Sequence, residues 1–144
     1  MTTVLQAGEG ELLGGATTVT IKAGGEHTGG TFYLGEVVAH AGFPGPPPHV
    51  HRRLHDMFYV LEGALTLQIG DETVELTPGG FACIPPGVVH SFGNRTEAPV
   101  RFLNFNTPAG WEHYMRDLEK TLADGTATQE EIGAIASRYD FELA

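Results

Sequence analysis

The sequence predicts an all-β fold, a sandwich or barrel of short strands, followed by two short helices. About eight short apolar segments succeed one another, turn residues separate them, and a helical period begins only beyond Pro108. The 20 glycines and 9 prolines among 144 residues suit strands joined by tight turns better than a helical bundle. A chain of this length forms one domain, 1–144, and we expect the barrel over about 12–107 and a helical extension over about 108–144.

The predicted strands are rich in β-branched and aromatic residues. The first covers 16–22, where most residues are β-branched. A loop at 23–30 leads to a second strand at 31–40, and 41–48 contains too much glycine and proline for a sheet interior. The later strands lie at 55–61, 64–69, 73–76, 81–85, 88–92 and 100–105. Strands of this length and spacing are typical of a sandwich or barrel.

Beyond Pro108 the apolar residues repeat with the period of an amphipathic helix. The residues on one face of the first helix, which ends before Gly125, are Trp111, Tyr114, Met115, Leu118 and Leu122. Thr128 and Glu131 form a capping box in front of the second helix. Its apolar residues are Ile132, Ile135, Ala136 and Tyr139. The extension is too short to bury a core of its own, so we expect it to cover the barrel or a subunit interface.

Charge and cysteine content restrict the class of partner. Eighteen acidic and 8 basic residues give a net charge of −10, and the only adjacent basic pair is Arg52–Arg53, which argues against a nucleic-acid partner. The single cysteine, Cys83, excludes an intrachain disulfide, and its apolar strand predicts a core position. The first residues lack the pattern of a secretion signal, and no apolar run is long enough to span a membrane. We therefore expect a cytoplasmic protein without a membrane partner.

Three histidines lie in two proline-rich segments. His49 and His51 follow the prolines at 46–48, and His90 follows the Pro-Pro-Gly sequence at 85–87. Because alternate residues of an extended strand point the same way, His49 and His51 present two imidazoles to one point in space. A further histidine or a carboxylate from another strand would complete a metal site.

These two segments resemble the two conserved motifs of the cupin superfamily. His49, His51 and Gly63 match the first motif, although Phe43 occupies the position of its first glycine. The residues that match the second motif are Gly79, Pro85, Gly87, His90 and Asn94. The resemblance covers 43–94 directly. It implies a double-stranded β-helix, which is a small jelly-roll barrel, and a homodimer.

The fourth ligand position of the family departs from its usual glutamate. A four-residue gap after His51 places Asp56 there, a three-residue gap places His55 there, and the distance to Gly63 favours Asp56. Because aspartate is one methylene shorter than glutamate, three arrangements stay open: ligation by Asp56, ligation by His55, or a site of three histidines. Each donor set suits one divalent transition metal, namely Fe, Mn, Ni, Cu, Co or Zn.

The resemblance implies activity on a small-molecule substrate. The segment 58–63 resembles cupins of the quercetin-dioxygenase type, which implies a mononuclear metalloenzyme acting on a small, largely apolar organic molecule. Small stand-alone cupins also include polyketide-pathway proteins, which implies a cyclase or rearrangement enzyme whose metal is a Lewis acid or is absent. A non-catalytic barrel that binds a small ligand is the third alternative.

Candidate residues around the metal follow from strand alternation. Phe58 shares a strand face with Asp56 and is the first expected wall of the substrate pocket, together with Val60 and Phe92. The residue types identify no catalytic acid, base or nucleophile. The side chains expected at the surface are His27, His40, Arg52, Arg53 and His113.

Overall fold

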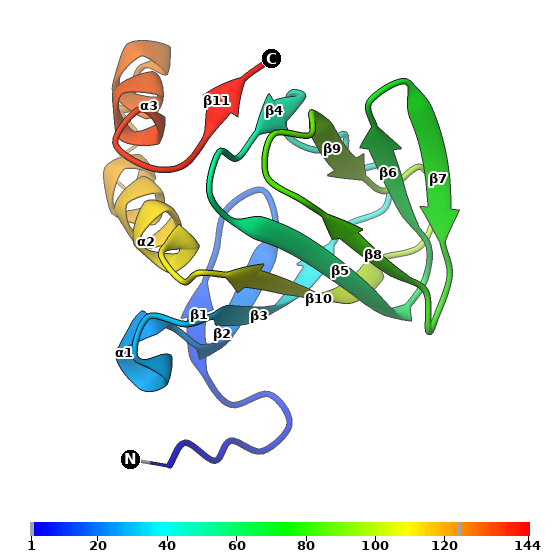
Figure 1. Ribbon diagram of the computed structural model, residues 1–144, viewed down its shortest axis with the longest axis horizontal. Helices are drawn as coiled ribbons and strands as arrows, with labels where there is room; N and C mark the ends of the chain where they lie inside the picture. The colour runs from blue at the N-terminus through cyan, green and yellow to red at the C-terminus, as the bar shows by residue number, and fades with distance from the viewer. Residues whose placement is uncertain (1, 124) are drawn as a thin grey trace.

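The computed structural model describes residues 2–123 and 125–144 and confirms the all-β fold with a helical extension. Two antiparallel sheets form a double-stranded β-helix (Figure 1). The strands of the first sheet, in spatial order, are β1 (Glu11–Leu13), β2 (Thr18–Ala23), β3 (Tyr33–Ala39), β10 (Val100–Thr107), β5 (His55–Glu62) and β8 (Phe81–Ile84). Those of the second are β11 (Glu142–Leu143), β4 (His49–Val50), β9 (His90–Gly93), β6 (Leu65–Ile69) and β7 (Glu72–Leu76).

Strand β5 shows the alternation that directs side chains into the barrel. Asp56, Phe58 and Val60 are buried, whereas His55 and Tyr59 are exposed. The neighbouring β10 pairs with β5 on one side and with β3 on the other. The inner face of the first sheet therefore presents apolar side chains along most of its length and a carboxylate near the start of β5.

Aromatic side chains from both sheets form the centre of the core. Phe58 of β5, Phe102 of β10 and Phe92 of β9 contact one another with ring centroids 5.7 to 6.0 Å apart. Phe58 and Phe102 are each 1% exposed, and Leu65 and Leu67 of β6 are fully buried beside them. Removal of this apolar surface from water is the main stabilisation of the barrel.

The helical extension covers the barrel, which is one of the two positions expected for it. Helix α2 (Trp111–Leu122) packs Trp111 and Met115 against the core. Helix α3 (Gln129–Ala136) begins at Thr128, whose hydroxyl accepts the N–H of Glu131 at 3.1 Å. Figure 1 shows both helices along one side of the barrel, with β11 returning from α3 to β4. No helix in the described residues is long and apolar enough to cross a membrane.

Three elements and two residues differ from the sequence-based predictions. Helix α3 ends at Ala136, so Tyr139 lies beyond the helix to which it was assigned. The one-turn helix α1 (Gly25–Thr28) lies in the predicted loop, and the short strands β1 and β11 were not predicted because they have too few residues to show a period. The core position predicted for Cys83 is wrong, since its side chain is exposed. All four residues of β8 are apolar, so the sequence does not show which face of this strand is buried. In the structure Ile84 is buried and Cys83 points outward.

Gly45 allows the loop before β4 to approach the backbone of β9 in the second sheet closely. Its φ is +84°, and a Cβ at this position would lie 1.6 Å from the carbonyl oxygen of Phe92. We expect Gly45→Ala to lower the free energy of unfolding by about 2–3 kcal/mol, because it adds left-handed strain to a backbone clash. Gly70→Ala is the matched control, since Gly70 also has a positive φ of +57° but has open space at the Cβ position. Equal losses in urea unfolding of the two variants would contradict the expected clash.

Candidate metal centre

Four buried side chains from three strands and a loop converge at one end of the barrel. His49 of β4, His51 just after it, Asp56 of β5 and His90 of β9 each offer one ligand atom, and these atoms lie within 4.8 Å of one another. His49 and His90 are direct partners in the β4–β9 ladder, which explains why the two motifs meet. His55 is exposed because strand alternation turns it away from Asp56. The structure therefore brings Asp56, and not His55, beside the three histidines.

Backbone carbonyls orient all three imidazoles through Nδ1. The contacts are His49 to Pro47 at 2.9 Å, His51 to Asp140 at 2.5 Å, and His90 to Val88 at 2.9 Å. A carbonyl oxygen only accepts hydrogen bonds, so each Nδ1 carries a proton. In the neutral ring Nε2 is then free to bind a metal, whereas in the protonated ring Nε2 of His51 or His90 can donate to Asp56. The neutral ring is the tautomer in which a histidine binds a metal through Nε2.

Two asparagines hold the carboxylate of Asp56. Its Oδ1 accepts N–H groups from Asn104 at 2.7 Å and from Asn106 at 2.8 Å. Its Oδ2 lies 3.0 Å from Nε2 of His90 and 3.5 Å from Nε2 of His51. One oxygen is thus occupied by the protein, and the other faces the imidazoles.

Burial and hydrogen bonding tune the protonation of these groups. Burial lowers the pKa of His49 to about 4, which favours its neutral form. Burial alone would raise the pKa of Asp56, but hydrogen bonds with His51 and His90 prevail and hold this pKa below its ordinary value. For His51 burial lowers the pKa, yet the hydrogen bonds with Asp56 and the Asp140 carbonyl produce a net increase. Asp56 is thus favoured as the carboxylate and His49 as the neutral imidazole, the forms that bind a metal, whereas at His51 a metal would compete with a proton.

The donor set fits a divalent first-row metal. Metal–nitrogen and metal–oxygen bonds of about 2.0–2.2 Å place adjacent donors about 3.0–3.5 Å apart. The two contacts of the Asp56 Oδ2 atom with His90 and His51, at 3.0 and 3.5 Å, match this spacing. Three imidazoles and one carboxylate are borderline donors that suit Fe, Mn, Co, Ni, Cu or Zn.

Aromatic side chains from the helical extension cover the histidines. Phe141 stacks on His49 with a centroid distance of 4.7 Å and an interplanar angle of 25°. Trp111 meets His51 edge-on at 5.3 Å, and Phe141 lies 5.8 Å from Trp111. The metal centre therefore lies beneath side chains from the last third of the chain.

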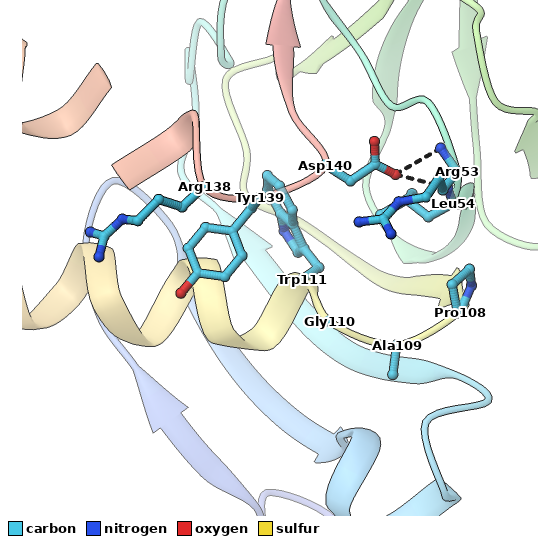
Figure 2. A pocket seen from close by; sticks show the side chains of 9 residues that line it. All are labelled: Arg53, Leu54, Pro108, Ala109, Gly110, Trp111, Arg138, Tyr139 and Asp140. Atoms are coloured by element: carbon cyan, nitrogen blue, oxygen red, sulfur yellow. Dashed lines mark hydrogen bonds between the residues drawn. The ribbon is translucent and has the colours of Figure 1, made fainter. Parts of the chain in front are cut away.

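The residues expected to line the substrate pocket have two different environments. Phe58 and Val60 lie within the core cluster, at 1% and 0% exposure. Phe92 is partly buried and also lines a hollow of about 370 Å³ between β6, β9 and the loop at 42–44. A smaller hollow of about 160 Å³ lies beside Trp111 (Figure 2).

Five residues expected at the surface, and Asn94 of the second motif, lie outside the metal group. The exposed side chains are His27, His40, Arg52, Arg53 and His113, as predicted. Asn94 of the second motif is buried, and its amide donates to the carbonyls of Ala39, His40 and Ala98. Its oxygen accepts the Thr96 N–H at 2.9 Å, so Asn94 holds the turn after β9.

The sequence reasoning missed four residues around the metal group. Asn104 and Asn106 are alternate residues of β10, and the period of two that linked His49 with His51 could have placed them on one face. Asp140 and Phe141 carry no comparable local signal, because the contacts with His51 and His49 arise only from the return of the chain through β11.

Removal of the two Asp56 partners should weaken metal binding. We expect Asn104→Ala/Asn106→Ala to lower the affinity for a divalent metal by about 10–100-fold, because Asp56 then loses the contacts that aim its Oδ2 atom. Competition with a chromophoric chelator measures this change. Gln68→Ala, whose amide bonds lie on the outer side of β6, is the control and should bind as the wild type does. If the double variant binds the metal as tightly as the wild type does, the two amides do not position Asp56 for metal binding.

Comparison with known proteins identifies relatives of this chain. A family model described as "Cupin domain" matches residues 35–106. The chain is 39% identical over 92 residues to quercetin 2,3-dioxygenase from Bacillus subtilis (strain 168), which covers 62% of this chain and 26% of the relative. The chain thus spans about a quarter of the length of that protein.

Solved structures with the same fold include two of similar size. The polyketide cyclase RemF from Streptomyces resistomycificus aligns with a TM-score of 0.65 and 25% identity over 74% of this chain and 80% of that one. An RmlC-like cupin from Shewanella frigidimarina NCIMB 400 also reaches a TM-score of 0.65, over 78% of this chain and 96% of that one. At 18% identity the second comparison supports the fold alone.

Proposed function

The chain belongs to the cupin superfamily, and on that premise we propose that it is a mononuclear metalloenzyme of the dioxygenase type that acts on a small, largely apolar organic molecule. One observation carries the proposal: three imidazoles oriented through Nδ1 converge with the carboxylate of Asp56 in a buried site, where the four ligand atoms lie within 4.8 Å of one another. The 39% identity to quercetin 2,3-dioxygenase supports the reaction type.

His49, His51, Asp56 and His90 would hold one ion of Fe, Mn, Ni, Cu, Co or Zn. When bound, such an ion would supply Lewis acidity toward a carbonyl or enol oxygen and, if it is redox-active, reactivity with dioxygen. The protein fixes the imidazoles through the three Nδ1 contacts and fixes Asp56 through the two asparagines. Phe141 and Trp111 exclude water from the side of the helical extension.

We propose that the substrate meets an apolar wall whose partly exposed residue is Phe92, supported from the packed core by Phe58 and Val60. Phe58 lies two residues from Asp56 on the inner face of β5, and its ring contacts Phe92 at 5.7 Å. This wall has no charged side chain, so it favours an apolar organic molecule that presents its few oxygens to the metal.

A cyclase is the second candidate function. The similarity to polyketide cyclase RemF at a TM-score of 0.65 and 25% identity favours it. In this reaction the barrel would position a flexible chain for ring closure, and a bound metal would polarise a carbonyl without consuming oxygen.

Metal analysis and oxygen uptake distinguish these functions. Protein purified without chelator should contain one Fe, Mn, Ni, Cu, Co or Zn ion per chain. Oxygen consumption with flavonols or 1,3-diketones supports the dioxygenase, whereas ring closure of a poly-β-ketone without oxygen uptake supports the cyclase. Tight binding of these compounds without turnover of any kind would contradict both enzymes and indicate a non-catalytic binding barrel.

A further inference from the structure

We propose that residues 139–144 form a strap that closes the metal centre, with Asp140 as its latch and as a positioning residue for His51. The inference deepens the proposed function, because it concerns access to the same site. It rests on contacts of the strap with the metal-ligand loop, on the place of Phe141 and on a hollow beneath the strap.

Phe141 is the cover of the metal centre. One face of its ring stacks on His49 at 4.7 Å. The ring also stacks with Tyr114 at a centroid distance of 5.8 Å, and its centroid lies 5.8 Å from that of Trp111. Both of these residues are on α2. The ring is therefore held between a metal-ligand imidazole and the helix, and a substrate that approaches His49 from this side must displace it.

Asp140 joins the strap to the loop that follows His51. Its Oδ1 accepts the N–H of Arg52 at 2.6 Å, and its Oδ2 accepts the N–H groups of Arg53 and Leu54 at 2.9 Å each. Its backbone oxygen accepts the Nδ1 proton of His51 at 2.5 Å. One residue therefore closes the strap with its side chain and orients a metal ligand with its main chain.

The other polar attachments of the strap are few. Strand β11 pairs with β4 over two residues, and Ala144 donates its N–H to Pro48 at 3.0 Å. Glu142 forms an ion pair with Arg52 at 2.6 Å, in which both side chains are exposed and which therefore adds little stability. Tyr139 also donates to Asp117 of α2.

A hollow of about 160 Å³ lies beneath the start of the strap, between residues 53–54, 108–111 and 138–140. Figure 2 shows Asp140 reaching across to the backbone of Arg53 and Leu54, with Trp111 on the opposite side of the hollow. The strap thus spans a space at this point and does not pack on the core. No strap residue belongs to the core cluster, so opening the strap breaks the ring contacts of Phe141 and Tyr139 but leaves that cluster intact.

Two consequences follow from this arrangement. While the strap is closed, Phe141 covers His49 and the Asp140 carbonyl orients His51. When the latch is released, the cover leaves and His51 loses its Nδ1 partner at the same time. Opening for substrate is therefore coupled to loosening of one metal ligand.

Hydrogen exchange of the 144-residue chain, with and without bound Zn²⁺, tests the latch. Asp140→Asn replaces a charged acceptor of three N–H groups with one neutral oxygen, and we expect exchange of the Arg53 and Leu54 amides to become about 10–100-fold faster. The Ala144 amide, which bonds Pro48 and not Asp140, should accelerate with them because the strap opens as one unit. Asp71→Asn, in the exposed turn between β6 and β7, is the matched control and should change none of these rates. Wild-type exchange at Ala144 in Asp140→Asn would overturn the proposal, as would acceleration that extends to core strands such as β10.

Phe141→Ala tests the cover separately from the latch. We expect this variant to retain slow exchange at Arg53 and Leu54 while Zn²⁺ passes to a competing chelator about tenfold faster than from the wild type. Trp111, the only tryptophan of the chain, should also become more accessible to a neutral fluorescence quencher. Unchanged Zn²⁺ release together with unchanged quenching would overturn the cover. If the protein binds no metal, the proposed function fails, but the exchange and quenching experiments still decide the strap.

Discussion

Alanine at both His49 and His51 is expected to abolish stoichiometric metal binding and activity. The double variant removes two of three imidazoles from a group whose ligand atoms lie within 4.8 Å of one another. His90 and Asp56 remain, and two donors hold a divalent ion far more weakly than four, so we expect the affinity to fall by more than about 1,000-fold. Metal analysis after loading and dialysis measures the loss.

The controls for this experiment separate the metal site from the fold. His27→Ala/His40→Ala removes two exposed histidines and should leave metal content and stability unchanged. The two metal-site positions are 3% and 4% exposed, so circular dichroism must show that the His49→Ala/His51→Ala variant keeps its β-sheet. Full metal content or full activity in that folded variant would refute both metal-dependent mechanisms.

Phe58→Ala should greatly reduce the free energy of unfolding. Phe58 is 1% exposed and contacts Phe92 and Phe102 at 5.7 and 6.0 Å. Truncation leaves a cavity between the two sheets, and large-to-small changes of this kind reduce the free energy of unfolding by about 3–5 kcal/mol. Urea unfolding monitored by circular dichroism measures the change.

Phe81→Ala is the control for the removal of an aromatic ring from a strand. Phe81 is 58% exposed on the outer face of the edge strand β8, so its loss should change stability by less than about 0.5 kcal/mol. Phe58→Leu should recover most of the stability, because it refills much of the cavity. A loss below about 1 kcal/mol in Phe58→Ala would mean that the ring borders open space and not a packed core.

Much of the barrel could be predicted because strands have a local period. Alternation in 55–61 and 64–69 identified β5 and β6 to within a residue at each end. The three-residue β1 and the two-residue β11 are too short to show a pattern, and their partners in the sheet define them. Cys83 was misplaced since a uniformly apolar strand does not reveal which face is buried, and an edge strand exposes one of them.

The candidate site could be predicted only in part for a related reason. The alternation of His49 and His51 is local, and the resemblance linked them to His90. His55 and Asp56 are neighbours on β5, so they point to opposite faces of the sheet. Alternation alone does not show which of these faces is the inner one, and the packing of the two sheets decides it. The Asn104 and Asn106 contacts join residues about 50 positions apart in sequence, and the His51–Asp140 contact joins residues 89 positions apart.

Spacing within a few residues is enough to predict the strands of the barrel, the two helices that follow it and the shared direction of His49 and His51, whereas the resemblance to the cupin motifs added His90. The tertiary structure alone places Asp56 beside them, directs two asparagines to its carboxylate, and brings Phe141 and Asp140 into contact with His49 and His51. A period of two residues specifies which side chains share a face, but it contains no information on which faces meet. That choice depends on the packing of distant segments, and around this metal centre those segments are β10 and the returning C-terminal strand.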